Sequence, residues 1–219
     1  MITFEQIRKN EDIRAYIEAA DASLVELGFT EHSYAHVGRA AEIAGRILSA
    51  VGCDAHQVEL ARIAGYMHDI GNVVNRSDHS QSGAIMAFRI LDKLGMAAAD
   101  IATIVTAIGN HDEGTGVPVN MVAAALILAD KTDVRRSRVR NSDFSRFDIH
   151  DRVNYSVERS ELHILPEERI VRLDLSIDTA ISSIMDYFEI FLQRMQMCRR
   201  SAEKLGLSFK LVINSQEFI

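Results

Sequence analysis

A nearly continuous helical periodicity from about residue 11 to residue 140 limits the folds open to this chain. Apolar residues recur at intervals of three and four, the spacing that places them on one face of a helix. Glycines fall near most segment ends, where a cap or turn can use a positive φ. They are Gly28, Gly52, Gly71, Gly95, Gly114 and Gly116. The pattern predicts six helices with short connections, over residues 11–27, 32–51, 54–70, 80–95, 98–111 and 119–133.

Beyond residue 140 the apolar pattern changes. The segments RVNYSVE (152–158) and IVRLDLSID (170–178) alternate apolar and polar residues, as half-buried strands do. Helical spacing then returns from Ile181 to Met195, and FKLVI (209–213) predicts a last strand.

The two patterns together predict a mainly α protein. A helical domain is expected over residues 1–140, and a small α+β unit, made of antiparallel strands and a long helix, over residues 141–219. Phe188, Phe191 and Met195 on that helix suit burial within the fold, a cover over the site, or contact with a second copy. A homodimer through residues 141–219 is therefore one expectation.

Composition excludes several classes of protein. The formal charge of −7 argues against broad affinity for nucleic acid. No run approaches the ~20 apolar residues of a membrane span, and the segment MITFEQIRKN lacks the apolar core of a signal peptide. Cys53 and Cys198 are far apart without CxxC spacing. These features predict a cytoplasmic protein without membrane or nucleic-acid partners.

Titratable residues stand at the ends of apolar helix faces. His68 and Asp69 close one apolar run just before Gly71, and Asp130 ends the run MVAAALILA. An ionised carboxylate buried alone costs several kcal/mol, so each aspartate requires a cation, a salt bridge or several donors. A packed histidine and an aspartate that caps a turn are the alternatives.

Three more histidines extend this pattern. His36 follows His32 by four residues, His79 opens a helix, and His111 closes another on its inward face. Each alone is more often a packed or surface histidine. Together, the nitrogen and oxygen donors suit Fe, Mn, Co, Ni or Zn rather than Ca. Six ligands suit two ions that share a bridging carboxylate, and they are His36, His68, Asp69, His79, His111 and Asp130.

The order of these residues, with HDIG at 68–71, resembles the HD-domain superfamily of metal-dependent phosphohydrolases. The segments HSQSGA (79–84), NHDEGTG (110–116) and ILADKTDVRR (127–136) most resemble the bacterial family that splits diadenosine tetraphosphate symmetrically. Asp112 stands where that family has threonine. The resemblance implies a helical HD bundle that hydrolyses a nucleotide or a related phosphate ester by attack of a metal-bridging hydroxide.

The resemblance also implies two divalent transition-metal ions, with Fe or Mn favoured and Zn, Co or Ni as alternatives. It assigns one ion to His36, His68, Asp69 and Asp130, and the second to Asp69, His79 and His111. Asp112 is a further candidate ligand, or a turn residue.

The remaining candidates would act on the substrate. RRSRVR is a basic run in an otherwise acidic chain, and Arg136 falls where the resembled family has its arginine. Lys131 is a second candidate for the phosphate. His32 could be a third-metal ligand, a hydrogen-bond donor that orients the site, or the acid that protonates the leaving group.

Two other functions stay open. HDEGTGVP (111–118) is similar to a shortened motif of the HD-GYP class, which hydrolyses cyclic dinucleotides. A regulatory module that keeps the metal site but does not catalyse is the other alternative.

Overall fold

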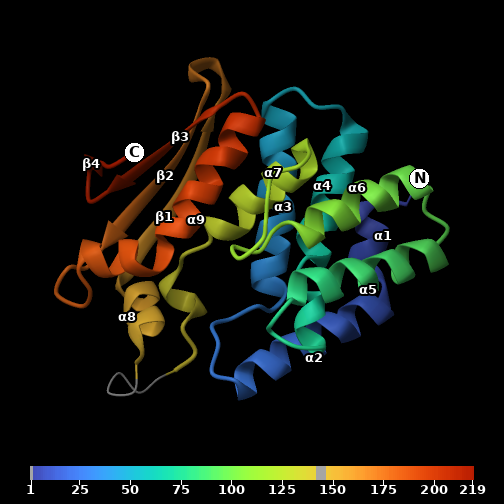
Figure 1. Ribbon diagram of the computed structural model, residues 1–219, viewed down its shortest axis with the longest axis horizontal. Helices are drawn as coiled ribbons and strands as arrows, with labels where there is room; N and C mark the ends of the chain where they lie inside the picture. The colour runs from blue at the N-terminus through green and yellow to red at the C-terminus, as the bar shows by residue number, and fades with distance from the viewer. Residues whose placement is uncertain (1, 142–146) are drawn as a thin grey trace.

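The computed structural model describes residues 2–141 and 147–219, so residues 142–146 of the predicted C-terminal unit lie outside the described residues. The chain forms a helical body with a small sheet on one side (Figure 1). The helical body consists of α1 (Phe4–Lys9), α2 (Glu11–Glu26), α3 (Tyr34–Ala50), α4 (Ala55–Met67), η1 (Ile70–Val73), α5 (His79–Lys93), α6 (Ala98–Gly109), α7 (Met121–Lys131) and η2 (Arg136–Arg138). The C-terminal part consists of α8 (Ile149–Ser156), β1 (Val157–Leu165), η4 (Pro166–Glu168), β2 (Ile170–Ile177), α9 (Ile184–Lys204), β3 (Ser208–Ile213) and β4 (Gln216–Glu217). The predicted class, mainly α with a small α+β unit, is confirmed.

Helix α7 runs through the centre of the helical body (Figure 1). Every residue from Val122 to Ala129 is buried, because α3, α4, α6 and α9 surround the helix. A helix that is apolar on all sides is stable only in such a position. The apolar run therefore carries Asp130, at its end, into the interior.

The sheet has the strand order β1-β2-β3-β4, with β2 parallel to β3 and the other pairs antiparallel. The prediction of antiparallel strands is therefore wrong for β2 and β3, because helix α9 connects them and returns the chain in the same direction. The buried residues Val171, Leu173, Leu175 and Ile177 alternate along β2, as the sequence pattern predicts. Helix α9 packs on β2 and β3 and also on α7, so it joins the sheet to the helical body (Figure 1). The sheet and the helices share one hydrophobic core.

Residues 152–158 were predicted as a strand, and that prediction is wrong for most of the segment. Helix α8 continues to Ser156, and β1 begins only at Val157. The Asp148 side chain accepts a hydrogen bond from the Asp151 amide and starts the helix. Alternation over so few residues does not distinguish a strand from a helix whose buried residues include Val153 and Ser156.

Two further features differ from or extend the sequence pattern. Helix α1 lies ahead of the first predicted helix and begins with a capping box of Thr3 and Gln6. Phe191 and Met195 of α9 are buried within the chain itself. The homodimer through residues 141–219 stays a prediction. Across the described ranges, none of the helices has the length and apolarity to cross a membrane.

Candidate metal centre

Successive helix ends bring the predicted ligands together inside the helical body. The element that carries each one either begins or ends at the site, so the side chains converge on one place. They are His36 in the first turn of α3, His68 at the end of α4, Asp69 at the start of η1, His79 at the start of α5, His111 after α6, and Asp130 in the last turn of α7.

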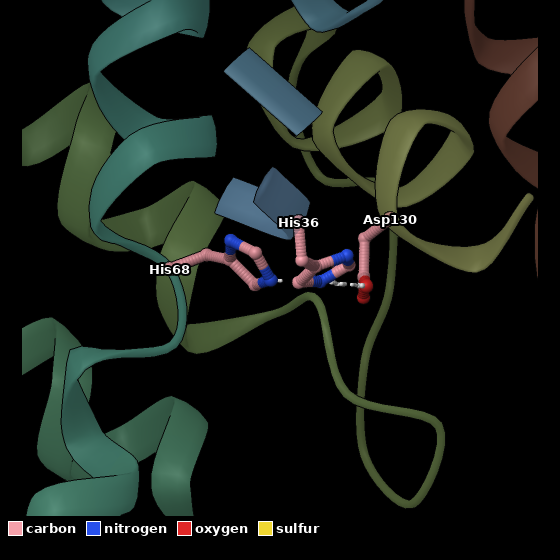
Figure 2. A group of neighbouring side chains, drawn as sticks. All are labelled: His36, His68 and Asp130. Carbon is pink, nitrogen blue, oxygen red and sulfur yellow. Dashed lines mark ion pairs between the residues drawn. The ribbon is translucent and has the colours of Figure 1, made fainter. Parts of the chain in front are cut away.

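One group of donors consists of His36, His68 and Asp130 (Figure 2). The Asp130 Oδ1 atom lies 3.3 Å from His36 Nε2 and 3.7 Å from His68 Nε2. Both imidazoles are buried, and the Asp130 side chain is 10% exposed. Ligands about 2.0–2.2 Å from a transition metal lie roughly this far from one another, so the group can hold one ion.

Asp69 lies between this group and a second one. Its Oδ2 atom is 3.2 Å from His68 Nε2 and 3.6 Å from His36 Nε2. Its Oδ1 atom is 3.5 Å from His79 Nε2 and 3.9 Å from His111 Nε2. The Nε2 atoms of His79 and His111 are themselves 3.2 Å apart. One carboxylate therefore faces both donor groups, as a bridging ligand would.

Two buried polar atoms at this point have no hydrogen-bond partner among the described residues, His36 Nε2 and Asp69 Oδ2. Buried polar atoms in native proteins are nearly always satisfied, and leaving one unpaired costs about 1–3 kcal/mol. Both atoms are good donors to a divalent transition metal. The residues therefore fit a metal ion.

A hydrogen bond from Nδ1 fixes the orientation of each of the four imidazoles. The Nδ1 atoms of His68, His79 and His111 donate to backbone carbonyl oxygens at 2.8, 3.0 and 2.6 Å. His36 Nδ1 donates to Asp133 Oδ2 at 2.8 Å. A carbonyl or carboxylate oxygen can only accept, so the proton is on Nδ1. Each Nε2 is then directed toward the others, available to a metal.

The charges of the site favour a cation at its centre. Burial by itself lowers the pKa of His68, but the carboxylates of Asp69 and Asp130 outweigh it and raise the pKa to about 10. Burial opposes ionisation of the two carboxyls, yet His68 beside Asp69 and Lys131 beside Asp130 hold their pKa values well below the usual range. The two carboxylates therefore stay ionised and stabilise positive charge beside them. A divalent ion would supply that charge in place of the His68 proton.

A cavity of about 320 Å³ opens onto these donors. Asp69, His79, His111 and Asp130 line it on the metal side. Its other polar lining includes the cationic side chains of Arg76, Lys131, Arg138 and Arg194 and the acidic side chains of Asp148 and Asp151. With divalent metal held by the donors, positive charge would exceed negative charge, and a negatively charged ligand is the kind that such a cavity would bind.

Lys131 pairs with two carboxylates at the cavity. Its Nζ atom is 2.8 Å from Asp130 Oδ2 and 3.0 Å from Glu113 Oε2. Arg194 of α9 pairs with the other oxygen of Glu113. Lys131 therefore orients Asp130, and Glu113 links the site to α9.

His32 lines the same cavity, with its ring centre 5.4 Å from that of His36. Its Nδ1 atom donates to the Thr30 carbonyl at 2.6 Å. Burial lowers the pKa of His32 well below its usual range, so the imidazole is neutral at physiological pH. A neutral ring that donates through Nδ1 has its lone pair on Nε2, and this favours a metal-ligand or acceptor role over that of leaving-group acid.

Two predicted residues lie at or outside the margin of the site. Asp112 Oδ1 is 3.9 Å from His79 Nε2, and its side chain is 30% exposed. Arg136 does not line the cavity. Its Nε atom donates to the Tyr155 carbonyl at 2.5 Å, and its guanidinium lies 4.6 Å from the centre of the Tyr155 ring. Among the predicted run of arginines, Arg138 reaches the cavity instead.

The structure adds residues that the sequence did not single out. Asp133 is buried and contacts His36, and its spacing of three from Asp130 is the one signal that suggests a shared helix face. Asn72 donates to Asp69 Oδ1 at 3.0 Å. Arg76 and Glu113 lie in connecting segments, where periodicity carries no information.

Gly71 of the HDIG segment allows η1 and α5 to touch. A Cβ atom there would lie 2.0 Å from the His79 carbonyl oxygen and 2.4 Å from the Gly83 nitrogen. The expected positive φ is not found, since the glycines with positive φ are Gly28, Gly52, Gly95 and Gly206. Gly71 is needed for close backbone approach, and it sets the distance from Asp69 to His79.

Substitution of Gly71 with alanine should lower the free energy of unfolding by about 1–3 kcal/mol, because η1 must move away from α5. Metal affinity should fall as well, since His79 moves with α5. Chemical denaturation and calorimetric metal titration measure the two effects. Gly38→Ala in α3 is the matched control, because its Cβ would meet nothing within 4 Å and alanine favours the helix by about 0.5–1 kcal/mol. Equal stability of the two variants would contradict the packing role of Gly71.

Comparisons with known proteins give one family and two similar proteins. The family model described as the HD domain matches residues 33–187. An uncharacterized protein of Methanocaldococcus jannaschii is 24% identical over 207 residues, which covers 84% of this chain and 80% of that protein. The crystal structure of a predicted HD superfamily hydrolase from an uncultured Thermotogales bacterium is 26% identical, with a TM-score of 0.47, over 62% of this chain and 75% of that one.

Proposed function

Because the chain belongs to the HD domain family, we propose that it is a metal-dependent phosphohydrolase acting on a nucleotide or a related small phosphate ester. One observation carries the proposal. The Nε2 atoms of four oriented histidines and the carboxylates of Asp69 and Asp130 meet at one side of a cavity that also contains cationic side chains. That combination suits a divalent metal next to a phosphate group.

The proposed metal ligands form two sets. His36, His68, Asp69 and Asp130 would hold one ion, and Asp69, His79 and His111 the second, with Asp112 within reach of it. When bound, such ions supply Lewis acidity and activate water near neutral pH. Fe or Mn fits this mixed set of nitrogen and oxygen donors, as do Zn, Co and Ni.

The other cavity residues would position the substrate. Lys131 balances the charge of Asp130 and keeps its carboxylate directed toward His36. The guanidinium groups of Arg76, Arg138 and Arg194 supply donors for phosphate oxygens. The nearer resemblance, to the enzymes that split diadenosine tetraphosphate, offers that dinucleotide as one candidate substrate, and comparison of its binding with that of a mononucleotide tests it.

Product analysis tests this function. Metal-replete protein is incubated with nucleoside mono- and triphosphates, diadenosine polyphosphates and cyclic dinucleotides, and the products are identified by mass spectrometry. Turnover of one substrate class is expected, with loss on chelation and recovery when metal is added back. Turnover of cyclic dinucleotides alone would favour the phosphodiesterase alternative. The absence of turnover in protein shown to hold metal would favour the regulatory binding module.

A further inference from the structure

Arg76 connects the metal side of the cavity to its outer edge. Its Nη1 atom lies 3.4 Å from His79 Nε2 and donates to Asn72 Oδ1 at 3.3 Å. On the other side, its Cζ atom lies 5.5 Å from the centre of the Phe29 ring. The guanidinium is therefore next to a proposed metal ligand and next to an aromatic ring.

Arg76 is also the cavity cation without a carboxylate partner within the described ranges. Lys131 pairs with Asp130 and Glu113, and Arg194 pairs with Glu113. Arg138 donates to backbone carbonyls and approaches Asp133 at 4.0 Å. The positive charge of Arg76 is thus free to pair with a ligand, and a guanidinium matches two phosphate oxygens.

The loop between α2 and α3 places apolar side chains beside this charge. Leu27 and Phe29 line the cavity although they are 59% and 40% exposed. Gly28 between them has a φ of 77°, which favours glycine at the turn. A flat aromatic group that enters the cavity can stack on the Phe29 ring, and stacking of this kind tolerates any base.

The volume of the cavity limits the size of the ligand. About 320 Å³ is at the lower end of the ~300–1,000 Å³ found for small-molecule sites. One nucleoside with its phosphate is of this scale, whereas a dinucleotide requires a larger site.

We infer that Arg76 binds the substrate phosphate and that Phe29 stacks on the base, so that the ligand is a nucleotide with a single nucleoside. The inference rests on the proposed function, which identifies the phosphate as the group that reacts. It goes further by assigning the specificity for the leaving group to Phe29 of the α2–α3 loop, a residue that is not among the proposed metal ligands.

Calorimetric binding to the metal-loaded protein tests the assignment, with adenosine 5′-monophosphate, ribose 5-phosphate, inorganic phosphate and diadenosine tetraphosphate as probes. Phe29→Ala should weaken adenosine monophosphate binding by roughly 5- to 150-fold, the loss expected for one stacked base. It should leave ribose 5-phosphate and inorganic phosphate unchanged. Arg76→Gln should weaken all phosphate-containing probes together.

Phe88→Ala and Arg89→Gln are the matched controls, because both residues are exposed on α5 and neither lines the cavity. A Phe29→Ala variant that binds adenosine monophosphate as tightly as the wild type would overturn the inference. So would tighter binding of diadenosine tetraphosphate than of the mononucleotide. Base-dependent binding without turnover of any substrate would support the inference and contradict the proposed function, so the two failures are distinguishable.

Discussion

The Asp69→Asn variant is expected to bind metal more than 100-fold less tightly and to lose the proposed hydrolysis. The Asp69 carboxylate faces His68 and His36 with one oxygen and His79 with the other, at 3.2, 3.6 and 3.5 Å. Asparagine has the same size but no charge, so neither proposed ion keeps its shared anionic ligand. Loss of an outer hydrogen-bond partner already costs about 10–100-fold in metal affinity, and loss of a direct ligand should exceed that range.

Metal affinity and thermal stability measure this effect together. A metal that binds the folded protein raises its melting temperature as the metal concentration rises above the dissociation constant. The wild type should show this rise with Mn²⁺ or Zn²⁺, and Asp69→Asn should not. Asp92→Asn removes an exposed carboxylate on α5 and should behave as the wild type does. An unchanged metal-dependent rise in Asp69→Asn would rule out Asp69 as a ligand.

The metal-free melting temperature separates lost binding from lost folding. Asn72 donates to Asp69 Oδ1 at 3.0 Å, and the amide oxygen of asparagine can accept the same hydrogen bond. We therefore expect the metal-free variant to unfold cooperatively, but at a lower temperature than the metal-free wild type, because buried His68 loses one of the two carboxylates that stabilise its charge.

The helical positions of the site were predictable because burial leaves a strong signal in sequence. Asp130 ends a run of apolar residues, and a carboxylate there must enter the interior with its helix. His68 and Asp69 are adjacent at a helix end, where the two side chains can point to one place. The structure brings these residues together with the other proposed ligands, whereas their role in binding metal stays a prediction.

Charge alone did not predict which arginines line the cavity. A basic run shows that positive side chains are present, but not which of them turns inward. Arg136 turns to Tyr155, whereas Arg76 approaches His79 from a connecting segment. The α2–α3 loop that carries Phe29 also has no periodicity. Loop geometry depends on tertiary packing, so the substrate side of the cavity was less predictable than the metal side.

Secondary structure at the start of the C-terminal part was also only partly predictable from apolar spacing. Long alternating segments such as β2 were predicted, because eight residues define one buried face. The short alternation around Val153 belongs to α8, which begins at the Asp148 cap. The hydrogen bond from the Asp151 amide to the Asp148 side chain favours a helix there, and apolar spacing carries no signal of that bond.

The Asp133→Asn variant tests whether a residue outside the proposed ligand set holds a ligand in place. Asp133 accepts from His36 Nδ1 at 2.8 Å and is 2% exposed. Arg39 and Arg135 approach the same carboxylate at 3.2 and 3.0 Å. Loss of its charge should reduce metal affinity by about 10–100-fold. The free energy of unfolding should also fall, by about 1–3 kcal/mol, because the buried hydrogen bonds to a charged carboxylate are weakened while Arg39 and Arg135 are partly exposed to solvent.

A purely structural role would lower stability without changing the histidine. If Asp133 fixes the tautomer, Asp133→Asn should shift the ¹⁵N resonances of the His36 ring toward a mixture of Nδ1–H and Nε2–H forms, at temperatures where the variant is fully folded. Asp100→Asn is the matched control, because Asp100 Oδ1 contacts His56 Nε2 at 2.8 Å and neither residue lines the cavity. It removes an equivalent histidine–aspartate contact and should leave both metal affinity and the His36 resonances unchanged. Unaltered His36 resonances in Asp133→Asn would show instead that the α3 backbone and its packing suffice to orient the ring.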